Sequence, residues 1–100
     1  MKIIKTAQHL QNVETRTPFD EREVTRAIRD AIIAEEDATK QYEVIVDSTK
    51  NKLVKKVLQD IANEEKVHVG ELQKLLNILL NNEKNFIQEG MEEVEKMKSK

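Results

Sequence analysis

Three features of the sequence predict an all-α fold: long stretches without a helix breaker, a heptad repeat of apolar residues, and few strand or turn residues. The 100 residues include only two glycines, one proline and 3% aromatic residues. A β-sandwich or barrel needs many Gly or Pro corners and aromatic strands, so these folds are excluded. Charged residues make up 36% of the chain, against about 25% in an average globular protein. Much of each helix is therefore expected to face water.

The composition also excludes several classes of function. Cysteine is absent, which rules out disulfides, thiolate metal sites and cysteine nucleophiles. The formal net charge is −2 and no basic block stands out, so a nucleic-acid partner is not expected. No apolar run approaches the roughly 20 residues that cross a membrane, and the N-terminus becomes charged too early for a secretory signal. We therefore expect a cytoplasmic protein with no membrane partner.

The first helix is expected to run from Phe19 to Ser48, because nothing interrupts it there. Thr17 followed by Pro18 predicts a cap and a first turn, and acidic residues just after them complement the helix dipole. Residues 1–18 show no sustained period. They are expected to form an N-terminal arm that is flexible on its own.

A second long helix is expected from Leu53 to Leu80, after a polar turn at residues 47–52. Two long helices joined by a short turn form an antiparallel hairpin, which would occupy residues 19–81. Residues 82–100 predict a shorter C-terminal helical segment that can split at Gly90. A hairpin of this size cannot bury its apolar stripe alone, so a second copy is expected to complete a four-helix bundle.

An apolar stripe with alternating steps of four and three residues runs along each long helix, as in bundles. In the first helix it comprises Val24, Ile28, Ala31, Glu35, Ala38, Tyr42, Ile45 and Thr49, and in the second Val54, Leu58, Ile61, Glu65, His68, Leu72, Leu75 and Leu79. We call these sixteen residues the seam. Glu35 interrupts its first half, and Glu65 and His68 interrupt its second. In an antiparallel hairpin the three polar residues lie at one level.

These three residues predict a metal centre. A buried carboxylate without a partner costs several kcal/mol, and the seam offers no Lys or Arg to balance it. The spacing Glu65-x-x-His68 puts an oxygen and a nitrogen ligand on one helical face. Di-iron bundles use one Glu from each of two helices and a Glu-x-x-His from each of the other two, so this chain carries half of that set. Two chains would supply four carboxylates, balanced by two divalent ions. Oxygen and imidazole ligands suit iron or manganese.

The same residues resemble a known family, the encapsulated ferritins, which are ferritin-like proteins with two main helices per chain. The resemblance spans roughly residues 27–90 and is carried by Ala34-Glu35-Glu36-Asp37, Tyr42 and Glu64-Glu65-Lys66-Val67-His68. It implies that Glu35, Glu65 and His68 of two chains bind a di-iron ferroxidase centre, with Glu65 bridging the ions. It also implies that Tyr42 lies beside this centre. Two departures are Gln41, where some members have tryptophan, and Ala34 and Asp37, where some have the glutamates of an outer metal site.

The resemblance further implies a function and partners. Fe(II) would be oxidised by dioxygen, and dimers would form a decameric ring inside an encapsulin nanocompartment that stores the iron. The chain would then be either cargo of the encapsulin shell protein or a domain fused in front of it. Two other interpretations stay open: a structural oligomerisation module with a buried polar layer, and a rubrerythrin-like peroxidase. The absence of Cys counts against the peroxidase, because such proteins often add a cysteine-ligated iron domain.

Overall fold

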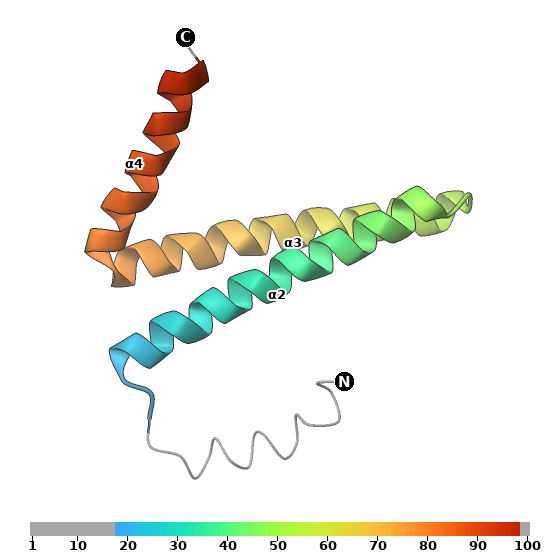
Figure 1. Ribbon diagram of the computed structural model, residues 1–100. Coiled ribbons are helices and arrows are strands. Elements are labelled where there is room, and N and C mark those ends of the chain that lie inside the picture. The colour runs from blue at the N-terminus through green and yellow to red at the C-terminus, as the bar shows by residue number, and fades with distance from the viewer. Residues whose placement is uncertain (1–17, 99–100) are drawn as a thin grey trace.

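The computed structural model contains three helices in the residues that it describes, which are 18–98 apart from the side chains of 82–85 (Figure 1). They are α2 (Glu21–Ser48), α3 (Lys52–Leu79) and α4 (Asn81–Lys98). Helices α2 and α3 form the expected antiparallel hairpin, and of these two helices α4 contacts only α3. The all-α prediction is confirmed for this part of the chain. The predicted arm lies outside the described residues, except for Pro18.

Helix α2 begins later than predicted, and its cap is Asp20. The Asp20 carboxylate accepts a hydrogen bond of 2.8 Å from the backbone N–H of Glu23, and the Glu23 carboxylate accepts one of 3.1 Å from the N–H of Asp20. This capping box satisfies two backbone donors reciprocally. The prediction that Thr17 and Pro18 start the helix is therefore wrong, because the first helical residue is Glu21.

The turn between α2 and α3 is shorter than the predicted segment and spans residues 49–51. The side chain of Asn51 caps α3 by accepting a 3.1 Å hydrogen bond from the N–H of Val54. Across the turn, Lys55 Nζ of α3 donates a 2.6 Å hydrogen bond to the carbonyl of Val46, in the last turn of α2. A cation at this position complements the negative end of the helix dipole. The turn therefore closes the hairpin tightly.

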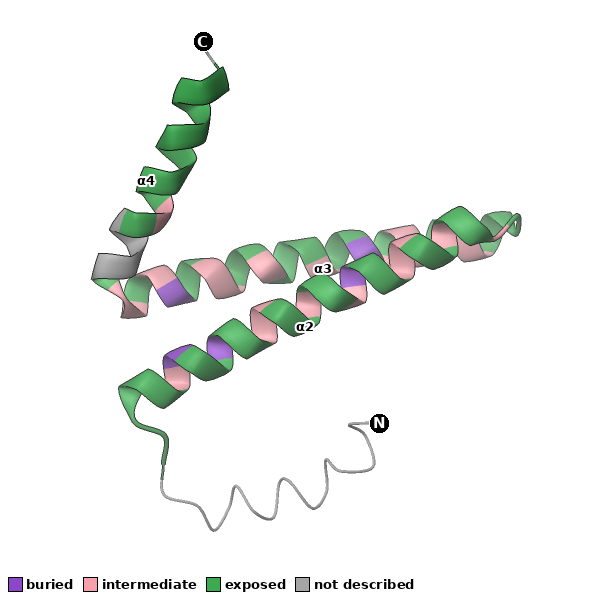
Figure 2. Ribbon diagram, in the orientation of Figure 1, coloured by how far each residue is buried: buried purple, intermediate pink, exposed green. Residues whose placement is uncertain are grey.

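Helix α4 follows α3 after a single non-helical residue, Leu80, whose φ of −121° and ψ of 81° end α3. The chain changes direction there, and α4 points away from the hairpin (Figure 1). The helix continues through Gly90, so the predicted split at that residue is wrong. Where side chains are described, almost all of α4 is exposed (Figure 2). No helix in the described range is long and apolar enough to cross a membrane.

The hairpin interface is narrow. The buried residues in the described range are Thr25, Ile28, Thr39, Ala62 and Leu76 (Figure 2). Only Leu76 combines a large side chain with nearly complete burial. The Cα radius of gyration is 17.9 Å, against about 13 Å for a compact 100-residue domain. A single chain therefore leaves much of its apolar surface uncovered.

The residues at the centre of this interface are shifted by one position along the sequence from the predicted seam. Four of the five buried residues directly follow a seam position, as Thr39 follows Ala38 and Ala62 follows Ile61. One residue corresponds to a rotation of about 100° around a helix. The seam thus lies along one edge of the hairpin, where Ile45 and Leu75 remain 44% exposed. These seam positions thus face outward from a single hairpin, as expected for a stripe that a second copy would cover.

Candidate metal centre

The three predicted ligands come together at this edge of the hairpin. One ligand atom each from Glu35 of α2 and from Glu65 and His68 of α3 lie within 4.8 Å of one another. The Nδ1 atom of His68 lies 2.6 Å from a carboxylate oxygen of Glu35 and 3.6 Å from one of Glu65. No second group of this kind occurs in the part of the chain that the structure describes.

The hairpin geometry explains why residues far apart in sequence meet here. Glu35 lies 14 residues before Thr49, and Glu65 lies 14 residues after Asn51. Because both helices rise by about 1.5 Å per residue, equal distances from the turn place the two carboxylates at the same level. His68 follows one helical turn later on the same face of α3. The antiparallel argument made from the sequence is thus confirmed for the level of these residues.

The three side chains are less buried than expected. The side chains of Glu35, Glu65 and His68 are 24%, 18% and 49% exposed. The sequence predicts a dry position for all three in a bundle of two chains, and a single chain leaves them partly exposed. The physical reason is the rotation described above: these side chains lie at the open edge of the α2–α3 interface, which one hairpin cannot close.

The cluster changes the proton affinity of its histidine. The hydrogen bond from the His68 ring to Glu35 raises the pKa of His68, partial desolvation opposes this shift, and the negative charges of Glu35, Glu65 and Glu71 add to it. Below this raised pKa, His68 carries a positive charge between two carboxylates. A proton therefore stabilises the site in the position where a metal cation would otherwise balance the acids.

The donor set fits a divalent first-row metal. Nitrogen and oxygen donors bind such ions at about 2.0–2.2 Å, so neighbouring donors of one ion lie about 3 Å apart. The two distances from Nδ1, 2.6 Å and 3.6 Å, lie on either side of that value. Two carboxylates and an imidazole without thiolate favour iron or manganese over metals that prefer sulfur. One chain offers only three protein ligands, which leaves coordination positions open.

Tyr42 lies on the same face of α2 as Glu35, seven residues further along, and it is half-buried. This spacing corresponds to about 10 Å along the helix axis. Within one chain, Tyr42 is therefore a neighbour of the cluster and not a part of it, and a role beside the metal stays a prediction.

Sequence reasoning missed one ion pair beside the cluster. Lys66 Nζ lies 2.7 Å from a carboxylate oxygen of Glu43 and joins α3 to α2. Both residues sit next to predicted site residues, Glu65 and Tyr42, but they point to the other edge of the hairpin. Glu43 lies 6 residues before Thr49, whereas Lys66 lies 15 residues after Asn51, so counting from the turn gave no signal for this contact.

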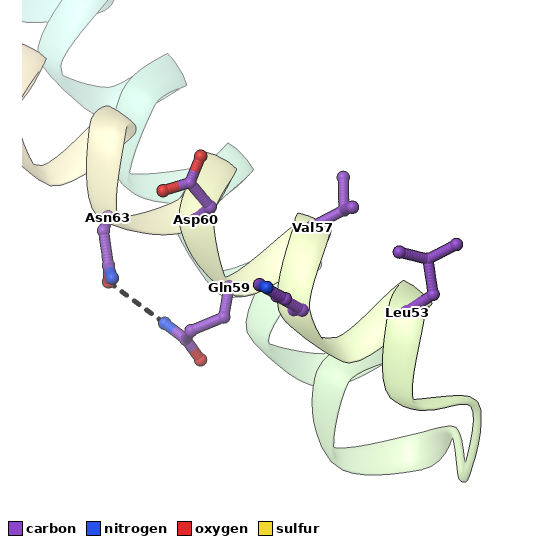
Figure 3. A pocket seen from close by; sticks show the side chains of 6 residues that line it. Leu53, Val57, Gln59, Asp60 and Asn63 are labelled. Carbon is purple, nitrogen blue, oxygen red and sulfur yellow. Dashed lines mark hydrogen bonds between the residues drawn. The ribbon is translucent and has the colours of Figure 1, made fainter.

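A shallow surface groove lies on α3 closer to the turn (Figure 3). It is lined by Leu53, Lys56, Val57, Gln59, Asp60 and Asn63. None of the three ligand residues lines this groove, so the chemistry of the cluster lies outside it.

Comparisons with known proteins agree with this geometry. A family model described as Rubrerythrin matches residues 26–99. A curated protein of Pyrococcus furiosus, "Ferritin-like-encapsulin shell fusion protein", is 39% identical over 80 residues, which are 80% of this chain and 23% of that protein. The chain thus spans about a quarter of the length of this relative. The crystal structure of the encapsulated ferritin domain from Pyrococcus furiosus matches with a TM-score of 0.82 and 36% identity, over 85% of this chain and 87% of that one. This likeness confirms the all-α, ferritin-like fold expected from the sequence.

Proposed function

Because the chain belongs to the encapsulated ferritin family, we propose that it is a ferroxidase that oxidises Fe(II) to Fe(III) at a di-iron centre shared between two subunits. The observation that carries this proposal is the approach of three ligand atoms from two helices to within 4.8 Å of one another. Fe(II) is the substrate, and Glu35, Glu65 and His68 are the residues that bind it.

A second copy would complete the site and cover the open edge. One chain supplies one glutamate helix and one Glu-x-x-His helix, which is half of a di-iron ligand set. Apart from Ile28 and the three ligands, one hairpin leaves every seam residue half-buried or exposed, on both sides of the cluster: Val24, Ala31, Ala38, Tyr42, Ile45, Thr49, Val54, Leu58, Ile61, Leu72, Leu75 and Leu79. Covering them with the same face of a second chain would complete a four-helix bundle. It would also set the four negative charges of the paired carboxylates against the four positive charges of two divalent ions.

Each site residue has a distinct task in this proposal. Glu35 is a terminal ligand, Glu65 bridges the two ions, and His68 binds through its nitrogen once it has lost its proton. Tyr42 lies beside the completed centre. Two Fe(II) ions each give up one electron, and dioxygen takes up two electrons and two protons to become hydrogen peroxide. The carboxylates stabilise the higher charge of the Fe(III) products, because they favour hard cations.

We also propose an encapsulin shell protein as the partner of this chain. The Pyrococcus furiosus relative is described as a fusion of a ferritin-like part with an encapsulin shell, and the aligned part is 23% of its length. The chain would act inside the nanocompartment, either as such a fused domain or as separate cargo. Dimers would assemble further into a ring, the oxidised iron being stored by the compartment.

Aerobic addition of Fe(II) tests the ferroxidase proposal. The wild type should produce ferric absorbance faster than a protein-free control, and Glu65→Ala should abolish the acceleration. Glu64→Ala is the matched control, because Glu64 is an exposed neighbour with the same side chain. Equal rates for wild type, Glu65→Ala and the protein-free control would exclude the enzyme.

The match to the Rubrerythrin family model favours a second candidate, the reduction of peroxide. In that reaction two Fe(II) ions each give one electron, and hydrogen peroxide is cleaved to two molecules of water as two protons are consumed. Anaerobic addition of peroxide to the Fe(II)-loaded protein separates the two functions. A ferroxidase should consume Fe(II) with dioxygen at least as fast as with peroxide, whereas a peroxidase should react much faster with peroxide.

A further inference from the structure

We propose that Lys66 and Glu43 are positioning residues for the metal centre, which hold α3 in the rotation that aims Glu65 and His68 at Glu35. This inference rests on the proposed function, since it concerns how well the same site binds metal. The pair itself binds no metal in this proposal. Its contribution is to the geometry of the residues that do.

Contacts at both edges of the hairpin join α3 to α2. Lys66 lies between Glu65 and His68 in sequence, and a step of two residues turns a helix by about 200°. His68 reaches α2 at Glu35 with a distance of 2.6 Å, whereas Lys66 reaches α2 at Glu43 with a distance of 2.7 Å. The two contacts therefore hold α3 from opposite edges of its interface with α2. A rotation of α3 that draws one contact closer pulls the other apart.

Apolar packing near the cluster is too slight to fix this rotation by itself. The buried residues nearest in sequence to the ligands are Thr39 on α2 and Ala62 on α3. Thr39 uses its hydroxyl to bond the carbonyl of Glu35 within α2, and Ala62 offers a single methyl group. The large buried side chains, Ile28 and Leu76, lie two turns away from Glu35 and from His68. Polar contacts at the edges consequently carry more of the orientation here than in a well-filled core.

The carboxylate of Glu43 is itself held in place from α3. Its hydrogen bond and charge interaction with Lys66 lower the pKa of Glu43, and a hydrogen bond from Gln59 acts in the same direction. Gln59 in turn donates a 3.1 Å hydrogen bond to Asn63 along α3 (Figure 3). Lys66 Nζ, 2.7 Å away, is therefore the main contact that fixes the position of this carboxylate against α3.

Lys66→Met in the full chain tests this role, with Co(II) as a redox-stable probe of the site. The variant keeps the aliphatic stem and removes the charge. If Lys66 positions the ligands, Co(II) should bind about 10-fold more weakly, the low end of what supporting residues around metal ligands contribute. The visible absorption bands of bound Co(II) should also change, because they report ligand geometry. Lys66→Arg should restore both values to near those of the wild type.

A charge effect alone would give the opposite sign, which makes the test decisive. Removing a cation near the site without moving its ligands should tighten Co(II) binding, so equal or tighter binding by Lys66→Met would overturn the inference. Glu43→Gln provides a second variant, and the double variant should lose no more affinity than either single one. Lys40→Met is the matched control, since Lys40 pairs at 3.5 Å with Asp37 within α2. It should bind Co(II) like the wild type.

Failure of the inference differs from failure of the proposed function. If the wild type binds Co(II) and Lys66→Met binds it with the same affinity, only the positioning role is overturned. Wild type that binds no Co(II) overturns both. The melting temperature and the helical circular dichroism of the metal-free variants should match those of Lys40→Met, which separates positioning from a general loss of structure.

Discussion

The two edges of the α2–α3 hairpin have opposite chemistry. One edge carries Glu35, Glu65 and His68 beside apolar residues such as Ile45 and Leu75 that remain 44% exposed. The other edge carries polar contacts made within the chain, among them Lys66 with Glu43. Acids gathered beside uncovered apolar side chains are unfavourable in an isolated chain, whereas the polar contacts of the other edge are already satisfied. The difference indicates that the first edge is built to be covered and that the second orients α3 against α2 within one chain.

The largest expected effect comes from making the first edge entirely apolar. Replacing Glu35, Glu65 and His68 together with leucine should abolish all metal-dependent stabilisation, because no ligand remains. For a site with metal at 100 times its dissociation constant, that loss is about 2.7 kcal/mol. Thermal unfolding with and without Mn(II) measures it. A structural polar layer predicts instead that wild type melts at the same temperature with or without metal, and that the triple variant melts higher.

A charge on the apolar part of the same edge should separate the two copies. Ile45→Lys is expected to weaken dimerisation at least tenfold, because the lysine would be buried without a partner. Val44→Lys is the matched control, because Val44 is the adjacent residue and is 57% exposed in the single chain. Sedimentation over a range of protein concentrations, with metal present, gives both dissociation constants. Equal weakening by the two variants would argue against a dimer through this edge.

Acidification should release metal from the first edge. The pKa of His68 is raised mainly by its hydrogen bond to Glu35, so the proton competes with metal below that raised value. Metal affinity should fall about tenfold per pH unit there, for each histidine that must lose a proton. Without metal, acidification has the opposite effect and stabilises the fold. The pairing of protonated His68 with Glu35 contributes fully below the usual pKa of 6.5, and its contribution is lost as the pH rises through the raised pKa of His68. Titration of Mn(II) at several pH values checks the first statement, and a flat profile would contradict it.

The smallest effect is expected at the second edge. The pKa of Glu43 is lowered mainly by its hydrogen bond to Lys66, so the pair stabilises the hairpin above the usual value of 4.5, and this contribution is lost as the pH falls through the lowered pKa. Because both side chains are substantially exposed, the change in melting temperature should be small. Salt should reduce it further. Comparing the melting temperatures of wild type and Glu43→Gln across pH 3–6 tests this, and a large difference would show that the pair is a main support of the fold.

The sequence predicted the hairpin and the level of the three ligands because both follow from counting residues. Helix period, turn position and equal distances from the turn are local properties of the chain. The start of α2 could not be predicted as well, because two caps competed there and the capping box of Asp20 and Glu23 prevailed.

The rotation of the hairpin interface by one residue was also missed. On α3, for example, the seam contains Ile61, whereas the buried residue is its neighbour Ala62. Such a rotation depends on whether each side chain faces the other helix of the hairpin or a second chain. One sequence does not separate these two kinds of contact, because both need apolar residues at heptad spacing.

The Lys66–Glu43 pair was missed for a related reason. Charged residues on helix surfaces are usually solvated, and a contact between them depends on the rotation of both helices. That rotation becomes known only when the burial of Thr39 on α2 and of Ala62 on α3 is seen in three dimensions.

Native mass spectrometry during stepwise addition of Mn(II) tests most directly whether two chains share the metal centre. The prediction is that metal appears only on dimers, up to one ion per chain, and that the dimer fraction rises with metal because binding and assembly are linked. Monomers that bind one ion each without dimerising, or dimers that never bind metal, would contradict a shared di-metal centre.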